Sequence, residues 1–463
     1  MSATPRTGAL ADFIAGFDAD VLPGAVRARI LELALDGTGC LLAAADPAFV
    51  TGARIAAFVR DQGGTPEASV VGHGFRTGGV NAALANGTMG YACDFEPHHP
   101  AAILHPAAVM VPTALALGER VGARGAHFLA AVALGCELEY RVSIALGPAE
   151  QYALGFHPSA VCGCFGATAA AAWLLELDAE AVTRALGLAA CQASGLMAWE
   201  SDPSENARPF QMGMAARNGI TAALLAAQGF GGPVGVFDHG HTVFEAFSRA
   251  PRLELLTEGL GQRWDGVTKL AIKPYPCVSF LHPALDALFA LVEEHGLGPG
   301  QIEAIVLRFP RSGVHCVDDN PLKSHCAQYV LPTALVRGRL EVADLFTDRR
   351  ASDPQIRALS QRVRVEPNDG ELEARFPERY ATELEVRTTS GKVLRRRNDV
   401  ARGYPETPMS PAEIEAKFDA LVGGVASATR VAALKSALAA LPETDALDDY
   451  AGLLRAPVEG GQG

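Results

Sequence analysis

The chain has 463 residues, enough for about three domain-sized units and a large hydrophobic core. Apolar residues make up 49% of the sequence and charged residues 20%, which excludes a wholly disordered chain. The 39 Lys and Arg against 52 Asp and Glu give a net charge of −13. This balance argues against non-specific binding to nucleic acid and against attraction to an anionic membrane surface.

The nine cysteines are too few, and odd in number, for a disulfide framework in a chain of this length. Most lie inside apolar runs, at positions such as Cys40, Cys136, Cys164 and Cys191. Reduced, buried thiols of this kind are typical of the cytosol. The first twenty residues contain three aspartates and no sustained apolar run, so we expect no signal peptide and a cytoplasmic location.

The sequence up to about residue 265 reads as a succession of helices. Ala-rich apolar segments recur, turn signals such as 229–233 (GFGGP) separate them, and alternating strand patterns are scarce. We expect a large helical domain whose central helices are apolar on most faces and therefore buried among the others. The predicted helices are 26–44, 79–89, 106–121, 127–145, 160–177, 181–193 and 214–228.

The pattern changes after Trp264. Residues 302–309 (IEAIVLRF) and 381–386 (ATELEV) alternate and are rich in β-branched side chains, and a hairpin turn at 388–392 leads into 393–397. Helical stretches at 283–295 and 332–337 accompany these strands. We therefore predict a smaller α+β lid domain at 266–404.

The helical pattern returns near Met409. Ser410 to Glu413 form a capping box with proline at the first helical position, and two more helices follow to about Leu454. We predict that residues 405–463 complete the large helical domain of residues 1–265. The predicted fold class is mainly α, with the lid domain inserted before the C-terminal helices.

The longest run without charged residues, 151–175, is long enough to cross a membrane. It contains His157, Pro158 and three glycines, however, so we interpret it as a loop followed by a buried helix. A histidine before proline favours extended backbone. At the start of such a helix its imidazole can act as acid or base near neutral pH.

Three further segments concentrate polar side chains against apolar or Gly/Pro-rich surroundings. Residues 93–106 (CDFEPHHPAAILHP) hold two carboxylates and three histidines just before a predicted helix. The polar loop 201–213 carries Arg208, whose guanidinium fork matches a carboxylate. Lys273 lies in the proline-stiffened apolar run 270–277 (LAIKPYPC), where it could anchor an anion.

Each of these residues also has a simpler interpretation. The side chains of 93–106 could cap helices, and His157 could be a satisfied core histidine. Arg208 could form an ordinary surface ion pair, and Lys273 could reach the surface along its aliphatic stem. A metal site at His157, Cys162 and Cys164 is disfavoured, because the chain has no CxxC pair and no HExxH motif. A P-loop, a GxSxG elbow and a dinucleotide-binding pattern are absent from the sequence as well.

Five segments together resemble the MmgE/PrpD family, and the resemblance covers nearly the whole chain. The family includes 2-methylcitrate dehydratases, cis-aconitate decarboxylases and iminodisuccinate epimerases. The resemblance implies a large helical domain with a smaller α+β lid, a site between them, a homodimer, and no iron–sulfur cluster or nucleotide cofactor. The matching segments are 94–109 (DFEPHHPAAILHPAAV), 155–175 (GFHPSAVCGCFGATAAAAWLL), 193–197 (ASGLM), 208–233 (RPFQMGMAARNGITAALLAAQGFGGP) and 273–286 (KPYPC followed by HPALD).

The resemblance also implies site residues. The catalytic candidates are Asp94, His105, His157 and Tyr329, and the substrate-binding candidates are His98, His99, Arg208, Gln211 and Lys273. The sequence departs from the family pattern where Pro97 stands for an acidic residue, His98 for threonine, Arg208 for lysine and Gln211 for histidine. These differences bear on which substrate is bound, and they are compatible with a small anionic carboxylate.

From this set we predict a cofactor-free lyase of the dehydratase type, acting on a small di- or tricarboxylate. Arg208 and Lys273 would stabilise the charge that grows when a proton leaves the carbon beside a carboxylate. His105 and His157 would serve as base and acid in an order that remains open, Asp94 would orient a histidine or act as base, and Tyr329 would donate to a substrate oxygen. Decarboxylation, epimerisation and a non-catalytic carboxylate-binding role stay open as alternatives. The expected partners are the substrate and a second copy of the chain, without nucleic acid or membrane.

Overall fold

A computed structural model describes residues 5–376 and 379–459. The fold is mainly α, with small sheets, and the chain divides into two units. The first comprises the described residues up to Leu270 and those from Ser410 onward, and the second is Ala271–Met409. The inserted unit therefore begins and ends a few residues later than the sequence predicted. Among the described helices, none combines the length and hydropathy that crossing a bilayer requires.

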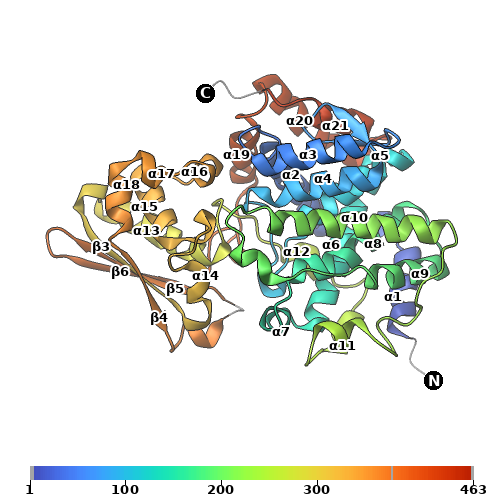
Figure 1. Ribbon diagram of the computed structural model, residues 1–463, viewed down its shortest axis with the longest axis horizontal. Helices are drawn as coiled ribbons and strands as arrows, with labels where there is room; N and C mark the ends of the chain where they lie inside the picture. The colour runs from blue at the N-terminus through green and yellow to red at the C-terminus, as the bar shows by residue number, and fades with distance from the viewer. Residues whose placement is uncertain (1–4, 377–378, 460–463) are drawn as a thin grey trace. The chain divides into compact units, whose positions relative to one another are not determined.

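The first unit is built from helices that pack around α8 (Figure 1). The unit also contains a short hairpin of β1 (Ala68–Val70) and β2 (Phe75–Thr77). The other helices before the insertion are α1 (Arg6–Ala15), α2 (Gly24–Ala43), α3 (Val50–Gln62), α4 (Gly79–Ala92), α5 (Ala107–Val121), α6 (Gly125–Leu146), α7 (Pro148–Ala153), α9 (Ala179–Ala190), α10 (Ala207–Ala227), α11 (Val243–Phe247) and α12 (Asp265–Thr268). After the insertion come α19 (Pro411–Val422), α20 (Ala428–Ala440) and α21 (Asp448–Arg455).

Helix α8 (Pro158–Leu174) is buried along almost its whole length, as the charge-free sequence predicted. It packs against α5, α6, α9 and α10. Glycines allow the close approach of these helices: a Cβ on Gly219 of α10 would lie 2.4 Å from the Ala167 Cβ of α8. A Cβ on Gly87 of α4 would lie 2.8 Å from the Cα of Gly213. The starts of α8 and α10 are thereby held beside the end of α4.

Two helix starts follow the sequence signals closely. Pro158 is the first residue of α8, and His157 precedes it in extended conformation. The side chain of Ser410 caps α19 in the predicted capping box with Glu413. The predicted start of α10 was wrong: the helix begins at Ala207 rather than Met214, so Arg208 lies in its first turn and not in a loop.

The second unit is a four-stranded sheet with helices packed on it (Figure 1). The order is β4-β3-β5-β6, with β3 parallel to β4 and antiparallel to β5, and with β5 antiparallel to β6. In register, Leu307 faces Val365 on one side and Leu384 on the other. The strands are β3 (Ile302–Pro310), β4 (Val363–Asn368), β5 (Thr382–Thr388) and β6 (Val393–Asn398). The helices are α13 (His282–His295), α14 (Val314–Val317), α15 (Ala327–Arg337), α16 (Val342–Phe346), α17 (Arg349–Ser352) and α18 (Pro354–Ser360).

The cysteines are free thiols, and most are buried. Burial raises the pKa of the Cys40, Cys136 and Cys164 thiols, so they stay protonated at neutral pH. Cys191 was predicted to be buried, but it is exposed because it follows directly after the end of α9.

Candidate active site

The loop that follows α4 brings Asp94 to the start of α10. Asp94 adopts a left-handed backbone conformation with φ of 48°, which is uncommon for a residue other than glycine. Its buried carboxylate oxygen Oδ2 accepts hydrogen bonds from Nη1 and Nη2 of Arg208, both at 3.2 Å. The unusual turn thus serves to place a carboxylate against a buried guanidinium.

The guanidinium of Arg208 contacts two aromatic rings. Its guanidinium carbon is 4.8 Å from the ring centre of Tyr91 and 5.2 Å from that of Trp199, within the range of cation–π attraction. Burial alone would lower the pKa of this guanidinium, but the Asp94 carboxylate outweighs burial and the net shift is upward. Arg208 is therefore a permanent positive charge, buried beside two aromatic rings.

His105 is paired with the second carboxylate of the same loop. Its Nδ1 lies 2.6 Å from Oε1 of the fully buried Glu96. The main-chain N–H of His105 donates to the hydroxyl of Ser159 at the start of α8. The Tyr91 ring meets the His105 ring edge-on at 4.7 Å between centroids, and the buried His98 ring stacks on it at 6.0 Å. A carboxylate in this position stabilises positive charge on the imidazole.

His157 is paired with an amide and not with a carboxylate. Its Nδ1 lies 3.0 Å from Oε1 of Gln211, and Nε2 of Gln211 donates to the carbonyl of Leu196. Because the amide nitrogen must be the donor to Leu196, the amide oxygen accepts the Nδ1–H of His157, and the ring's Nε2 carries the lone pair. Burial lowers the pKa of His157 to about 3. At neutral pH His157 is therefore an uncharged imidazole whose Nε2 carries no proton.

The side chain of His99 contacts main-chain groups. Its Nδ1 accepts from the N–H of Ala102 and so caps the short turn Pro100–Ala102, while its Nε2 lies 3.3 Å from the carbonyl oxygen of Asp265. Burial lowers the pKa of His99 to about 4. Both ring nitrogens thus have protein partners, an arrangement that supports the cap interpretation over substrate binding.

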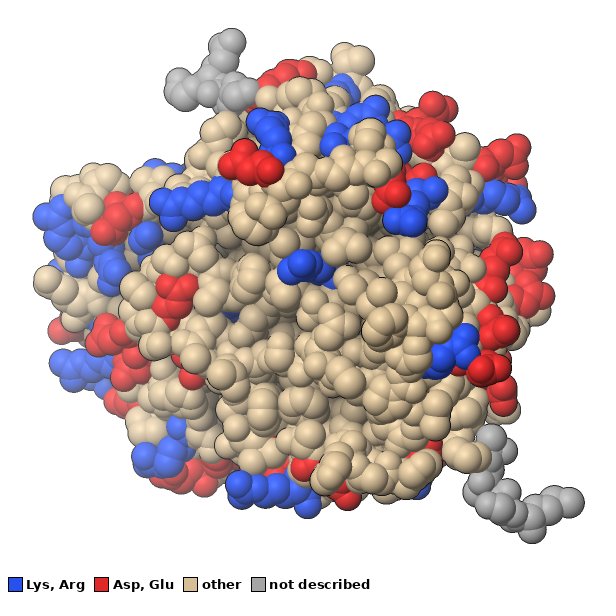
Figure 2. All heavy atoms as spheres, turned by 45° about the vertical axis from the view of Figure 1, so that its right-hand side comes forward, with Lys and Arg blue, Asp and Glu red and all other residues tan. Residues whose placement is uncertain are grey.

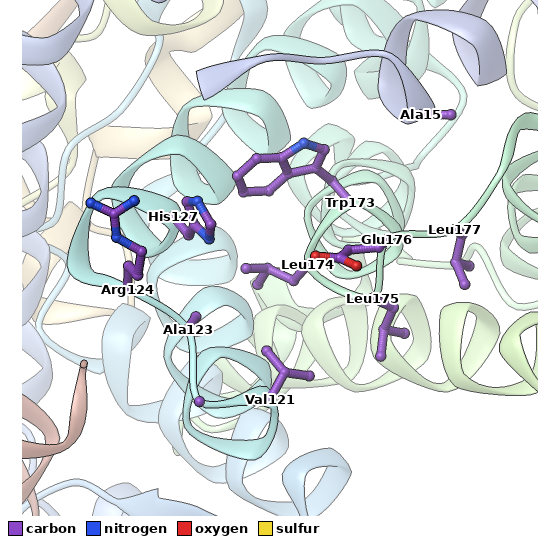
Figure 3. A pocket seen from close by; sticks show the side chains of 11 residues that line it. Ala15, Val121, Ala123, Arg124, His127, Trp173, Leu174, Leu175, Glu176 and Leu177 are labelled. Atoms are coloured by element: carbon purple, nitrogen blue, oxygen red, sulfur yellow. The ribbon is translucent and has the colours of Figure 1, made fainter. Parts of the chain in front are cut away.

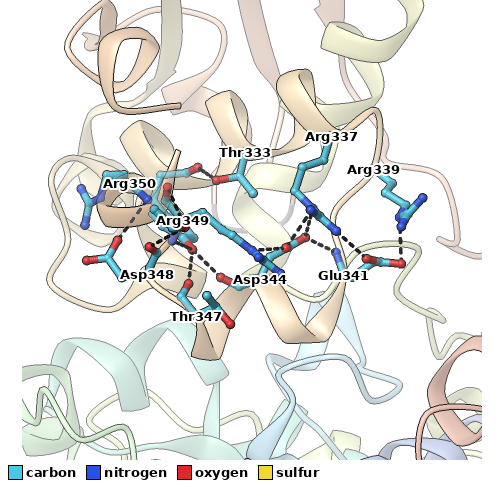
Figure 4. A network of polar contacts seen from close by, with 11 residues as sticks. Thr333, Arg337, Arg339, Glu341, Asp344, Thr347, Asp348, Arg349 and Arg350 are labelled. Atoms are coloured by element: carbon cyan, nitrogen blue, oxygen red, sulfur yellow. Dashed lines mark hydrogen bonds and ion pairs between the residues drawn. The ribbon is translucent and has the colours of Figure 1, made fainter. Parts of the chain in front are cut away.

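Lys273 and Tyr329 belong to the second unit and are both buried. The Tyr329 hydroxyl donates toward the carbonyls of Asp344 and Thr347 and accepts from the N–H of Arg349. Figure 4 shows the polar network around Asp344. A phenol has one proton to donate, and here main-chain carbonyls receive it. The structure thus assigns Tyr329 to the architecture of α15–α17 and gives no support to its predicted role as a proton donor to substrate.

Three residues of this cluster were not among the predicted site residues. Glu96 could have been found, since it is the other carboxylate of the segment that holds Asp94 and lies nine positions before His105. Tyr91 and Trp199 carry no such signal, because their role depends on how α4, α10 and the turn before α10 pack. Of the predicted residues in the first unit, Asp94, His98, His105, His157, Arg208 and Gln211 form one connected cluster.

A separate cavity of about 610 Å³ opens at the other end of α8 (Figure 3). Trp173, His127 and Arg124 line it, together with leucines of 174–177. None of the predicted site residues lines this cavity. Since His157 precedes the first turn of α8 and Trp173 lies in its last, the cavity and the cluster occupy opposite ends of the same helix.

The fold and the cluster define a helical protein in which a buried guanidinium and two imidazoles, one paired with a carboxylate and one with an amide, lie at the ends of α4, α5, α8 and α10. In a comparison with protein families, the MmgE/PrpD N-terminal domain matches residues 8–256 and the MmgE/PrpD C-terminal domain matches residues 275–442. The chain belongs to the MmgE/PrpD family.

Curated relatives are named as cis-aconitate decarboxylases. The cis-aconitate decarboxylase-like protein oryM of Aspergillus oryzae is 31% identical over 296 residues, which is 61% of this chain and 60% of that protein. The human cis-aconitate decarboxylase is 30% identical over 353 residues, or 73% of this chain and 72% of its own length. The Aspergillus terreus enzyme is 25% identical over 466 residues, covering 95% and 94% of the two chains.

Proposed function

We propose that this chain is a cofactor-free lyase that removes CO2 from a small unsaturated tricarboxylate of the cis-aconitate kind. The observation that carries the proposal is the buried cluster itself, in which a permanent cation lies beside one carboxylate-paired imidazole and one neutral imidazole. The names of the relatives favour decarboxylation over the dehydration that the sequence alone put first.

The reaction needs a stabilised electron pair and a proton. When the C–C bond to a carboxylate on a saturated carbon breaks, its electrons form a new double bond to the neighbouring carbon. The electrons of the original double bond move to the outer alkene carbon, next to a remaining carboxylate, and that carbon takes up a proton. One proton is consumed and one CO2 is released. The site must therefore hold a cation where charge accumulates and a proton donor close to carbon.

The Glu96–His105 pair fits the proton donor. The Glu96 carboxylate accepts the Nδ1–H and stabilises the imidazolium, so the Nε2 proton of His105 can pass to carbon and be replaced from solvent. The ring of His157 stays neutral, and its Nε2 can accept a hydrogen bond from a protonated substrate oxygen or remove a proton. These assignments give the two histidines distinct roles.

Arg208 fits the charge-stabilising position. Its guanidinium has five N–H donors, and the Asp94 carboxylate orients it through two of them. In a dry site a fixed cation stabilises developing charge more than it would in water. For Lys273, the proposed role in binding a substrate carboxylate rests on its place in the sequence.

Dehydration is the second candidate: the unprotonated Nε2 of His157 would take a proton from the carbon next to a carboxylate, and the imidazolium of His105 would protonate the leaving hydroxide. Epimerisation would use the same two groups on opposite sides of one carbon. A non-catalytic carboxylate-binding protein would retain Arg208 and Asp94 without turnover.

These alternatives separate in one experiment. The purified protein is incubated with cis-aconitate, citrate-type hydroxy acids and related dicarboxylates in heavy water, and the products are followed by NMR. Decarboxylation predicts loss of one carboxyl signal and one deuterium on carbon. Conversion of a hydroxy acid to an alkene would favour dehydration instead, and binding without any conversion would contradict an enzymatic role.

We also propose a homodimer. One broad face of the protein carries few charged side chains (Figure 2), and large apolar side chains are exposed between residues 196 and 234, namely Leu196, Phe210, Leu225, Phe230 and Val234. Large exposed apolar side chains that lie together on a surface favour an interface. Sedimentation of the wild type and of Phe230→Asp tests this, since a dimer whose interface includes these exposed apolar side chains predicts a lighter species for the variant.

A further inference from the structure

The loop that carries Asp94 and Glu96, called the site loop below, is contacted by the C-terminal helix α19. At this contact lies a buried ion pair that has no role in the function proposed above. Nζ of Lys417 in α19 lies 2.6 Å from Oδ1 of Asp36 in α2. Both side chains are buried, at 4% and 0% exposure. Burying two charges is costly unless the geometry is favourable, so the position of this pair calls for a structural reason.

Lys417 also contacts the loop between the two site carboxylates. Its ammonium donates to the carbonyl of Phe95 at 2.7 Å and lies 3.8 Å from the centre of the Phe95 ring. Phe95 stands directly between Asp94, which contacts Arg208, and Glu96, which contacts His105. One lysine thus fixes the peptide that carries both carboxylates.

Cys93, the residue before Asp94, is anchored to α2, the helix that also carries Asp36. The thiol of Cys93 donates to the carbonyl of Cys40 in α2 at 3.5 Å. A Cβ on Gly39 would lie 3.0 Å from the Phe418 ring, so α19 approaches α2 closely at this point. The left-handed turn at Asp94 therefore lies between two anchored residues, as a strained conformation requires.

We propose that Lys417, supported by Asp36, is a positioning residue for the proposed reaction: it holds the loop in which Asp94 orients Arg208 and Glu96 polarises His105. This inference rests on the proposed function for its kinetic readout only. It explains why the segment after the inserted unit returns to pack on α2. In the sequence, Lys417 is an ordinary lysine on an amphipathic helix 322 residues from Phe95.

The test compares Lys417→Met with the wild type by two readouts. The first is the pair of ring ¹⁵N chemical shifts of His105, which reports how fully Nδ1–H is held by Glu96 and does not require turnover. The second is kcat and KM for the acid that the wild type converts. In Lys417→Met we expect the ¹⁵N shifts of the His105 ring to move toward those of mixed tautomers. We also expect kcat to decrease about 10- to 100-fold with KM changed much less, because a misplaced acid impairs the chemical step.

Two further variants keep the test decisive. Lys417→Met leaves Asp36 buried without its partner, so Asp36→Asn/Lys417→Met removes both charges and is expected to recover stability without recovering the histidine signals. Tyr450→Phe is the matched control, because it deletes the 2.8 Å bond between α21 and Thr38 of α2 and leaves the site loop untouched. It should change neither readout.

Wild-type His105 signals in both Lys417 variants would overturn the inference, as would a wild-type kcat in a folded Lys417 variant. If the wild type converts no acid, the proposed function fails, whereas the histidine signals still decide whether Lys417 positions the loop. A perturbation of equal size in Tyr450→Phe would also overturn the inference, since it would show that any loosening of the C-terminal helices has the same effect.

Discussion

Replacing His157 by Asn should make the protein less sensitive to acid. Burial lowers the pKa of His157 to about 3 from an ordinary value of 6.5, so the folded protein keeps this ring neutral while the unfolded chain protonates it. Because the unfolded state binds the extra proton, His157 reduces stability as the pH falls from about 6.5 toward 3. Asn does not titrate, and its side-chain N–H can still donate to Gln211.

The size of the effect follows from the two pKa values. Between pH 7 and pH 5 the unfolded histidine becomes almost fully protonated and the folded one does not, which costs about 2 kcal/mol. His99, whose pKa burial lowers to about 4, contributes a similar loss of about 2 kcal/mol. Between pH 7 and pH 5 the free energy of unfolding of the wild type should therefore fall by the sum of the two costs, and that of His157→Asn only by the cost due to His99.

Urea unfolding at pH 7 and pH 5, followed by tryptophan fluorescence, measures this difference. The three tryptophans, Trp173, Trp199 and Trp264, all lie in the helical unit that contains His157. Comparing the two pH values within each protein cancels the constant cost of the substitution. Equal losses of stability in the wild type and in His157→Asn would refute the assignment of His157 as a buried neutral imidazole.

Four other results are expected. Arg208→Met removes the guanidinium that neutralises the buried Asp94 carboxylate and should lower the free energy of unfolding by about 3–5 kcal/mol; an unchanged urea midpoint would contradict the buried pair. Glu96→Gln should lower kcat by about 10²- to 10⁴-fold with a small change in KM, measured by steady-state kinetics, and an unaltered kcat would remove Glu96 from the mechanism. Tyr329→Phe should destabilise the α+β unit by about 1–3 kcal/mol, seen in its thermal melt, because the Asp344 and Thr347 carbonyls lose their donor. Treatment with a chelator followed by desalting should leave turnover unchanged, whereas loss of activity that a metal restores would contradict the cofactor-free proposal.

Much of the helical unit could be predicted from the sequence because its signals are local. Proline at a helix start marks the beginning of α8, and the Ala-rich, charge-free segment behind it could only be buried. The beginning of α10 was missed because residues 201–213 are polar, and burial of Arg208 against Asp94 is a tertiary effect that local propensity does not report.

The strand β4 (Val363–Asn368) was missed for a similar reason. Its sequence, VRVEPN, is short and largely polar, and it becomes a strand because it pairs in parallel with the buried β3. Parallel pairing joins segments distant in the sequence, so no hairpin signal announces it.

The candidate site was predictable in its residue types and less so in their roles. The sequence placed His98, His99 and His105 in one segment, but it could not show that His99 binds main-chain groups while His105 pairs with Glu96. It likewise suggested Tyr329 as a donor to substrate, although the carbonyls that accept its proton come from Asp344 and Thr347, fifteen and eighteen residues away. Such choices depend on packing.

The most direct test of the central claim uses cis-aconitate labelled with ¹³C in its carboxyl groups. The wild type and His105→Asn are incubated with it in sealed tubes, and released ¹³CO2 and the remaining acids are quantified. A decarboxylase with His105 as its proton donor should give stoichiometric ¹³CO2 and dicarboxylate, and His105→Asn should be at least about 10²-fold slower. Absence of ¹³CO2 from the folded wild type, or an equal rate from the variant, would contradict it.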